Sequence, residues 1–161
     1  MLNKKYLAAV ILLAACGSDD DKGGSAVDGS KKGSSLTAEE ANMLCESVTA
    51  KGPSPEAFCT AYAALLSADK ATCGEAAKGC IDEVDSEDPC DDAMSDLAGC
   101  DLTVKEIETC LNAQGKLLSD AVDGVTCDDA GSDDLPDLEK IVEEVPSECK
   151  NVVSMCPKLV E

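Results

Sequence analysis

The sequence predicts an all-α fold, a small disulfide-stapled bundle of five to seven helices that follows a flexible N-terminal linker. Three observations lead to this prediction. Helix-capping motifs recur along the chain, apolar residues repeat at helical spacing without strand-like alternation, and eleven cysteines occur in 161 residues. In residues 36–161, Leu, Ile, Val and Phe number only 26 of 126, so the core is thin. Disulfides should therefore decide whether this part of the chain folds.

Residues 1–15 have the pattern of a signal peptide. Two lysines precede nine apolar residues, a run too short to cross a bilayer as a permanent helix. The run ends in a motif that resembles the lipobox of bacterial lipoproteins, Leu13-Ala14-Ala15-Cys16. The resemblance implies cleavage before Cys16, a diacylglycerol anchor with palmitate at this residue, and an outer-membrane location at the periplasmic face or the cell surface. The alternative is a signal peptide that carries a cysteine without lipidation.

Residues 16–35 are expected to form the lipidated cysteine and a disordered linker. The segment is rich in glycine, serine and aspartate, and Val27 is its one large apolar residue. Such a composition buries too little apolar surface to offset the entropy cost of ordering the chain. The remaining residues, 36–161, are expected to form a cysteine-rich, acidic helical domain.

The first two expected helices have clear start signals. Thr37-x-x-Glu40 is a capping box, and the helix that follows it should end near Gly52. Ser54 and Pro55 begin the second helix. The residues expected to face inward from this second helix are Phe58, Ala61, Tyr62, Leu65 and Leu66.

The later helices follow from the same signals. A third helix is expected to open at Thr72-x-x-Glu75, and a short fourth helix should follow Pro89. Thr103-x-x-Glu106 caps the clearest helix. The inward residues of that helix are Val104, Ile107, Leu111, Leu118 and Val122. Two further helices are expected over residues 136–145 and 147–156, each bounded by proline.

Ten cysteines lie in the expected helical domain, an even number once Cys16 is assigned to lipid. They are Cys45, Cys59, Cys73, Cys80, Cys90, Cys100, Cys110, Cys127, Cys149 and Cys156. An oxidising compartment predicts five disulfides among them, with the pairing unassigned. Cys73 and Cys80 are seven residues apart, as are Cys149 and Cys156. Seven residues climb about 10.5 Å along a helix, so neither pair should bridge internally.

The cysteine spacing carries two resemblances to known scaffolds. Cysteines recur every ten residues at Cys80, Cys90, Cys100 and Cys110. This spacing resembles that of mitochondrial helical-hairpin import substrates, but a lipobox belongs to another compartment. The body also loosely resembles the cysteine-rich lipoproteins of myxobacterial-type bacteria, in Leu102-Thr103-x-x-Glu106-x-x-x-Cys110 and Val145-Pro146-Ser147-Glu148-Cys149. This second resemblance implies a helical scaffold and brings no catalytic residue with it.

Composition argues against several classes of function. The chain has 13 lysines, 33 acids and no histidine, for a formal charge of −20. Nothing in it would neutralise the phosphates of a nucleic acid. The usual general base and the commonest metal ligand are missing, and no Cys-x-x-Cys pair suits zinc or an iron–sulfur cluster. We therefore expect no catalytic residue, no metal site and no cofactor.

Two acidic segments leave calcium binding open as an alternative. The first contains Asp82, Glu83, Asp85, Glu87, Asp88, Asp91 and Asp92, and the second contains Asp128, Asp129, Asp133, Asp134 and Asp137. Calcium takes about six to eight oxygen ligands, but neither segment has the EF-hand spacing. A solvated acidic surface is the favoured interpretation. A glycosidase-like enzyme that depends on two carboxylates is a weaker alternative, because the body offers only Phe58 and Tyr62 as aromatic platforms.

The sequence thus predicts a monomeric, lipid-anchored envelope lipoprotein with a structural or macromolecule-binding role. The membrane is its first partner, through the lipid anchor. Residues 36–161 have eight lysines against 29 acids. This imbalance suggests a basic envelope or surface macromolecule as the second partner.

Overall fold

The computed structural model describes residues 26–84 and 88–159, and the regular elements in this part of the chain are helices, with one isolated β-bridge between Lys32 and Thr103. The α-helices are α2 (Ala38–Thr49), α3 (Pro55–Leu66), α4 (Lys70–Val84), α5 (Ala93–Leu97), α6 (Val104–Val122), α7 (Leu138–Glu143) and α8 (Lys150–Met155). Short 3₁₀ turns are η1 (Gly33–Ser35), η2 (Cys127–Asp129), η3 (Ser147–Cys149) and η4 (Pro157–Leu159). The predicted all-α, disulfide-stapled bundle is confirmed.

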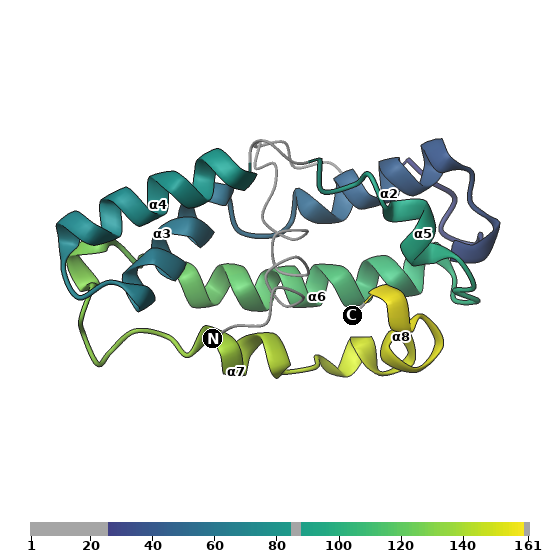
Figure 1. Ribbon diagram of the computed structural model, residues 1–161. Helices are drawn as coiled ribbons and strands as arrows, with labels where there is room; N and C mark the ends of the chain where they lie inside the picture. The colour runs from purple at the N-terminus through teal and green to yellow at the C-terminus, as the bar shows by residue number, and fades with distance from the viewer. Residues whose placement is uncertain (1–25, 85–87, 160–161) are drawn as a thin grey trace.

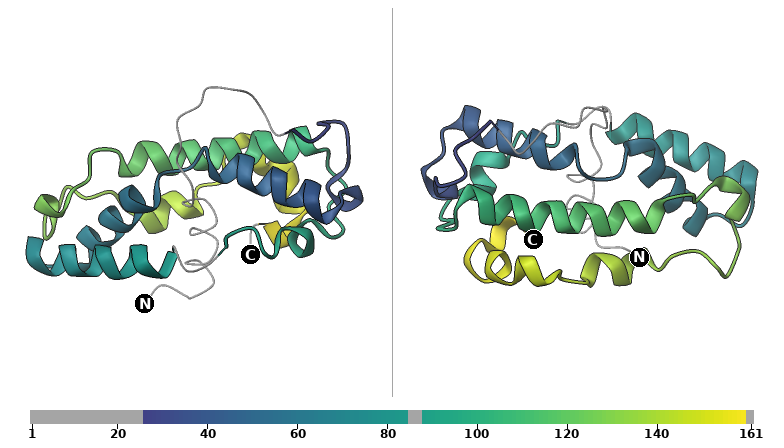
Figure 2. Two further views of the ribbon diagram at one scale, coloured as in Figure 1. Left: turned by 90° about the horizontal axis from the view of Figure 1, so that it is seen from above. Right: turned by 180° about the vertical axis from the view of Figure 1, so that it is seen from behind.

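Helix α6 forms the long axis of the molecule. Its 19 residues begin at the predicted capping box, in which Thr103 and Glu106 bond each other's backbone N–H groups. Helices α2, α5 and α8 lie beside its N-terminal half, whereas α3 and α4 lie beside its C-terminal end (Figure 1). The views from above and from behind show the same arrangement (Figure 2). The fold is therefore elongated along α6, with a group of helices at each end.

We call the group at the start of α6 the α2–α8 lobe, which comprises residues 26–53, 88–114 and 145–159. Its core is one continuous apolar cluster that includes Leu44, Val104, Ile107 and Val152. We call the other group the α3–α4 lobe, which comprises residues 54–84 and 115–144. Its apolar residues form three smaller clusters, centred on Phe58, Cys73 and Val122.

The α3–α4 hairpin differs from the sequence prediction at the end of α3 and at the start of α4. Leu65 and Leu66 were expected to face inward but are 36% and 65% exposed. Helix α3 instead buries Ala61, Ala63 and Ala64, small side chains that let a neighbouring helix approach closely. The predicted start at Thr72 was also wrong. Helix α4 begins at Lys70, because the Asp69 carboxylate accepts hydrogen bonds from the N–H groups of Ala71 and Thr72.

The prediction of a disordered linker was wrong for residues 26–35. Val27 is buried in the core of the α2–α8 lobe. The Gly33 N–H donates to the Leu102 carbonyl at 2.9 Å, and the Val104 N–H donates to the Lys31 carbonyl at 2.8 Å. These backbone bonds order a segment whose side chains bury little. Gly33 fits closely there, because a Cβ would lie 3.0 Å from Ile107 Cδ1 and 3.3 Å from the Cys100 carbonyl oxygen. The rest of the expected linker, residues 16–25, lies outside the described residues.

Candidate functional site

All ten cysteines of the described chain are joined in disulfides, as the sequence predicted. The pairs are Cys45–Cys90, Cys59–Cys80, Cys73–Cys127, Cys100–Cys156 and Cys110–Cys149. Neither of the two seven-residue spacings bridges internally, which confirms the helical-rise argument. The remaining predicted site residue, Cys16, lies outside the described residues.

Three disulfides hold the α2–α8 lobe. Cys45–Cys90 ties α2 to the turn before α5, and Cys100–Cys156 ties the segment before α6 to the end of α8. Cys110–Cys149 joins the middle of α6 to η3, with both cysteines buried. The last two bonds fix the short elements η3 and α8, which are too brief to be stable alone.

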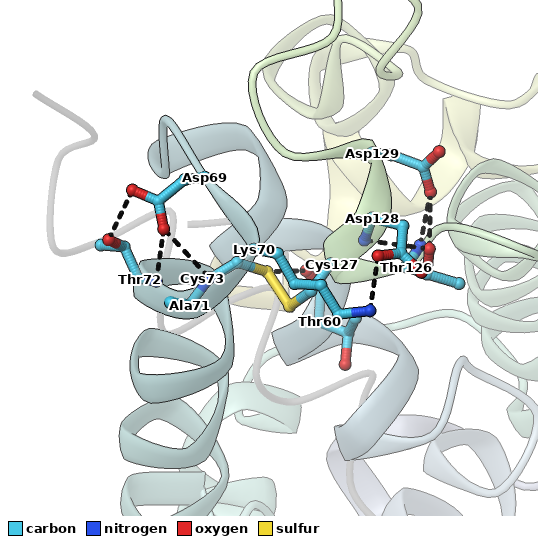
Figure 3. Close-up of a disulfide and its surroundings, with 10 residues drawn as sticks. All are labelled: Thr60, Asp69, Lys70, Ala71, Thr72, Cys73, Thr126, Cys127, Asp128 and Asp129. Carbon is cyan, nitrogen blue, oxygen red and sulfur yellow. Dashed lines mark hydrogen bonds and ion pairs between the residues drawn. A yellow bond between two sulfur atoms is a disulfide. The ribbon is translucent and has the colours of Figure 1, made fainter.

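Two disulfides hold the α3–α4 lobe. Cys59–Cys80 crosses the α3–α4 hairpin, and Cys73–Cys127 ties the first part of α4 to η2 (Figure 3). Cys73 and Cys80 share a face of α4 and use it to reach two different neighbours. Within the described chain, no disulfide joins this lobe to the α2–α8 lobe; the connection between the lobes is α6 itself and the segments that run beside it.

Two acids of the second acidic segment, Asp128 and Asp129, lie beside the Cys73–Cys127 disulfide (Figure 3). Asp128 forms an ion pair with Lys70 at 2.5 Å (Figure 3). Asp129 accepts bonds from the backbone N–H and the hydroxyl of Thr126, at 2.8 and 2.9 Å. The backbone bond first, and then the hydroxyl bond, lower the pKa of Asp129. These carboxylates are engaged in capping η2 and pairing with a lysine.

Other acids of the two segments have similar local roles. Asp82 accepts from Lys78 at 2.6 Å on the exposed face of α4, and Asp88 accepts from the Cys90 N–H at 2.9 Å. Asp137 caps α7 by accepting from the Lys140 N–H. Asp85 and Glu87 lie outside the described residues. In the described part of the chain, no three acids or cysteines are grouped so that they could hold a metal ion.

Phe58 and Tyr62 are side by side rather than open to a ligand. Their ring centroids are 6.2 Å apart with an interplanar angle of 10°. Phe58 is buried beside Cys59 and Val84, and Tyr62 is half-buried against the same cluster. The two rings belong to the α3–α4 packing, so the geometry gives the glycosidase alternative no aromatic platform.

One carboxyl group with an unusual environment was not singled out from the sequence. Burial, and then the negative charge of Asp92, raise the pKa of Asp96 on α5, while Lys158 opposes the shift. Lys158 belongs to η4 and comes near α5 only through the tertiary fold, because its Nζ lies 3.5 Å from the Ser95 carbonyl. The four-residue spacing of Asp92 and Asp96 could have indicated their proximity, but no sequence spacing relates Lys158 to α5, so only the structure reveals that contact.

These features define a class of protein: an acidic, all-helical domain held by five disulfides. No helix within the described ranges is long and apolar enough to span a membrane. Comparisons with protein-family models, curated proteins and solved structures find no significant match to this chain.

Proposed function

We propose that this chain is an envelope lipoprotein, anchored through lipid on Cys16, whose helical body binds another macromolecule and catalyses no reaction. The main support for this proposal is the number of cysteines that form disulfides. Ten of the eleven cysteines are used in disulfides, so Cys16 is the one left over. That cysteine also follows directly on Leu13-Ala14-Ala15 in the lipobox-like motif.

The disulfides support the same proposal because they indicate an oxidising compartment. Five disulfides in a body of this size form and persist in an oxidising environment and are rare in a reducing cytosol. Export by a signal peptide would deliver the chain to such an environment. The motif at the N-terminus and the chemistry of the folded body thus agree.

Metabolic labelling tests the anchor. In a bacterial host that is fed labelled palmitate, the natural chain should incorporate label and partition into detergent. Cys16→Ala should remove both properties, whereas Ser18→Ala, two residues further on, should leave them unchanged. An inhibitor of the lipoprotein signal peptidase should cause the precursor to accumulate. Labelling that survives in Cys16→Ala would disprove the anchor.

The proposed partner of the body is a basic macromolecule of the envelope or of a neighbouring surface. The support is the charge of residues 36–161, eight lysines against 29 acids, on a body made rigid by disulfides. Complementary charge speeds encounter and selects against other acidic surfaces. A rigid surface also loses less conformational entropy on binding than a disordered acidic chain.

A comparison of oxidised and reduced protein tests whether the folded surface is the binding element. The oxidised body and a reduced, alkylated body carry the same acids but differ in structure. The oxidised body should retain basic envelope proteins at low salt and release them as the salt concentration rises. The reduced body should retain less of these proteins at the same salt concentration. Equal retention by both forms would show that charge alone is responsible, and would overturn the proposed binding role of the fold.

A further inference from the structure

The anchor site and the folded body are closer together than the composition of the chain implies. Folded structure begins by residue 26, and Val27 is already part of the core of the α2–α8 lobe. Whatever conformation residues 17–25 adopt, the ten Cα–Cα steps from Cys16 to Ala26 span at most about 36 Å. The full expected linker, 16–35, would have allowed roughly twice this reach.

The body is attached at one end of its long axis. Residues 29–34 bond with residues 100–105, so the chain enters the fold beside the first turn of α6. Helix α6 rises about 27 Å over its 19 residues. The start of α4 and η2 lie at the opposite end of this axis (Figure 1).

Charge is distributed unevenly between the two ends. The α3–α4 lobe has 15 acids and four lysines, a net charge of −11, whereas the α2–α8 lobe has 12 acids and six lysines, a net charge of −6. Three exposed lysines lie on the segments that meet where the chain enters the fold: Lys31, Lys32 and Lys105. Two of them are paired with acids of the same region, Lys31 with Glu40 and Lys32 with Asp101. A lipid surface that carries anionic headgroups repels the α3–α4 lobe more strongly, within about one Debye length of 8 Å in physiological salt.

From these observations we infer that the end of the molecule formed by η1 and the starts of α2 and α6 faces the membrane. The α3–α4 lobe then points away from the lipid, where it is the part of the body open to other macromolecules. This orientation rests on the proposed lipidation of Cys16. It follows from the place of attachment at one end of the long axis and from the charge difference between the lobes.

Energy transfer to a labelled membrane tests the orientation. The lipidated full-length protein is reconstituted in vesicles of phosphatidylcholine and phosphatidylglycerol that contain an acceptor-labelled lipid. A fluorescent amino acid replaces either Ser34 in η1 or Ala71 in the first turn of α4, both of which are exposed. The two positions lie near opposite ends of α6, which rises about 27 Å, so transfer from position 34 should exceed that from position 71 by about twofold.

Vesicle flotation separates failure of the orientation from failure of the anchor. If the natural chain does not float with the vesicles, both proposals fail. If it floats but transfer from the two positions is equal, the lipoprotein proposal stands and the orientation is wrong. A long Gly/Ser insertion after Gly24 should preserve flotation and lower the transfer from position 34. Transfer that is unchanged by this insertion would also overturn the orientation.

Discussion

Gly115, in the middle of α6, lies directly against Gly52, in the connection between α2 and α3. A Cβ on Gly115 would lie 3.3 Å from Gly52 Cα and 3.4 Å from the Lys51 carbonyl oxygen. Glycine in a helix interior costs stability relative to alanine. At Gly115 the absence of a side chain lets the connection between α2 and α3 lie directly on the surface of α6. The chain crosses there from the α2–α8 lobe to the α3–α4 lobe, and this close contact offsets the cost of the glycine.

Gly115→Val should destabilise the protein by about 1–3 kcal/mol, because the added side chain would press against backbone atoms of Lys51 and Gly52 and force the two segments apart. Gly79→Val in α4 is the matched control, since a Cβ there meets no atom within 4 Å. Urea unfolding of both variants measures the difference. Equal midpoints for the two variants would contradict the close approach at Gly52.

Val27→Ala should also destabilise the body, although Val27 falls in a segment with the composition of a linker. Val27 is 7% exposed and packs in the core of the α2–α8 lobe. Complete burial of a valine side chain stabilises a fold by about 1.5–3 kcal/mol, and most of that contribution would be lost. Val153→Ala, at a position that is 40% exposed, should change the free energy of unfolding by less than about 0.5 kcal/mol. A Val27 variant as stable as the Val153 variant would restore the linker interpretation.

The capping box of α6 makes stability depend on pH. Hydrogen bonds from the hydroxyl of Thr103, at 2.7 Å, and from its backbone N–H, at 2.9 Å, lower the pKa of Glu106. Because the folded-state pKa is the lower one, the unfolded chain binds the proton more readily. The stabilisation is complete above the ordinary pKa of a glutamate and is lost as pH falls through the folded-state value.

Glu106→Ala should therefore be less stable than the natural chain at neutral pH, and this difference should shrink at about pH 3. Urea unfolding at the two pH values measures it. Glu75→Ala, at an exposed position in α4, serves as the control for the removal of one acid. A difference that stays constant between the two pH values would rule out a role for the ionised Glu106 side chain.

Removal of one disulfide should loosen one lobe and leave the other protected. Cys59→Ala with Cys80→Ala opens a loop of 21 residues, and a cross-link of this length contributes about 3 kcal/mol in the chain-entropy model. Hydrogen exchange should rise in α3 and α4 and stay low in α2 and α8. The opposite pattern is expected when Cys100 and Cys156 are replaced. Uniform acceleration across the body in either variant would show that the two lobes unfold as one unit.

Calcium should leave the protein unchanged. Several acids of the two segments already have partners: Asp82 and Asp128 pair with lysines, and Asp137 caps α7. Calorimetric titration of the oxidised protein with millimolar calcium should give no saturable heat, and the melting temperature should not move. Saturable binding with a rise in melting temperature would revive the calcium alternative.

The helix starts were predictable because their signals are local. Thr37 and Thr103 each cap a helix together with a glutamate three residues later, and both capping boxes are present. The predicted start of α4 was wrong because a second capping group precedes the motif in the sequence. Asp69 caps α4 in place of Thr72, and Thr72 itself donates to the Asp69 carboxylate. A capping motif in a sequence specifies that a helix begins, but neighbouring acids decide at which residue.

The number of disulfides was predictable and their pairing was not. An even count in the body follows once Cys16 is set aside, and helical rise excludes the Cys73–Cys80 and Cys149–Cys156 pairs. The choice of Cys127 for Cys73 requires η2 to lie beside α4. That contact depends on how the chain folds back after α6, which no spacing along the sequence encodes.

The sequence by itself determined the helical class, the main capping boxes and five disulfides that leave Cys16 outside the pairing, because each depends on local spacing or on a count. The tertiary structure alone decided the disulfide partners, the division into two lobes along α6, and the ordering of residues 26–35. These depend on backbone hydrogen bonds and close approaches between distant segments, such as Gly33 with Leu102 and Gly115 with Gly52. Composition does not reveal which distant segments meet, because the backbone hydrogen bonds that join them use atoms common to every residue and a glycine does not specify the segment that approaches it.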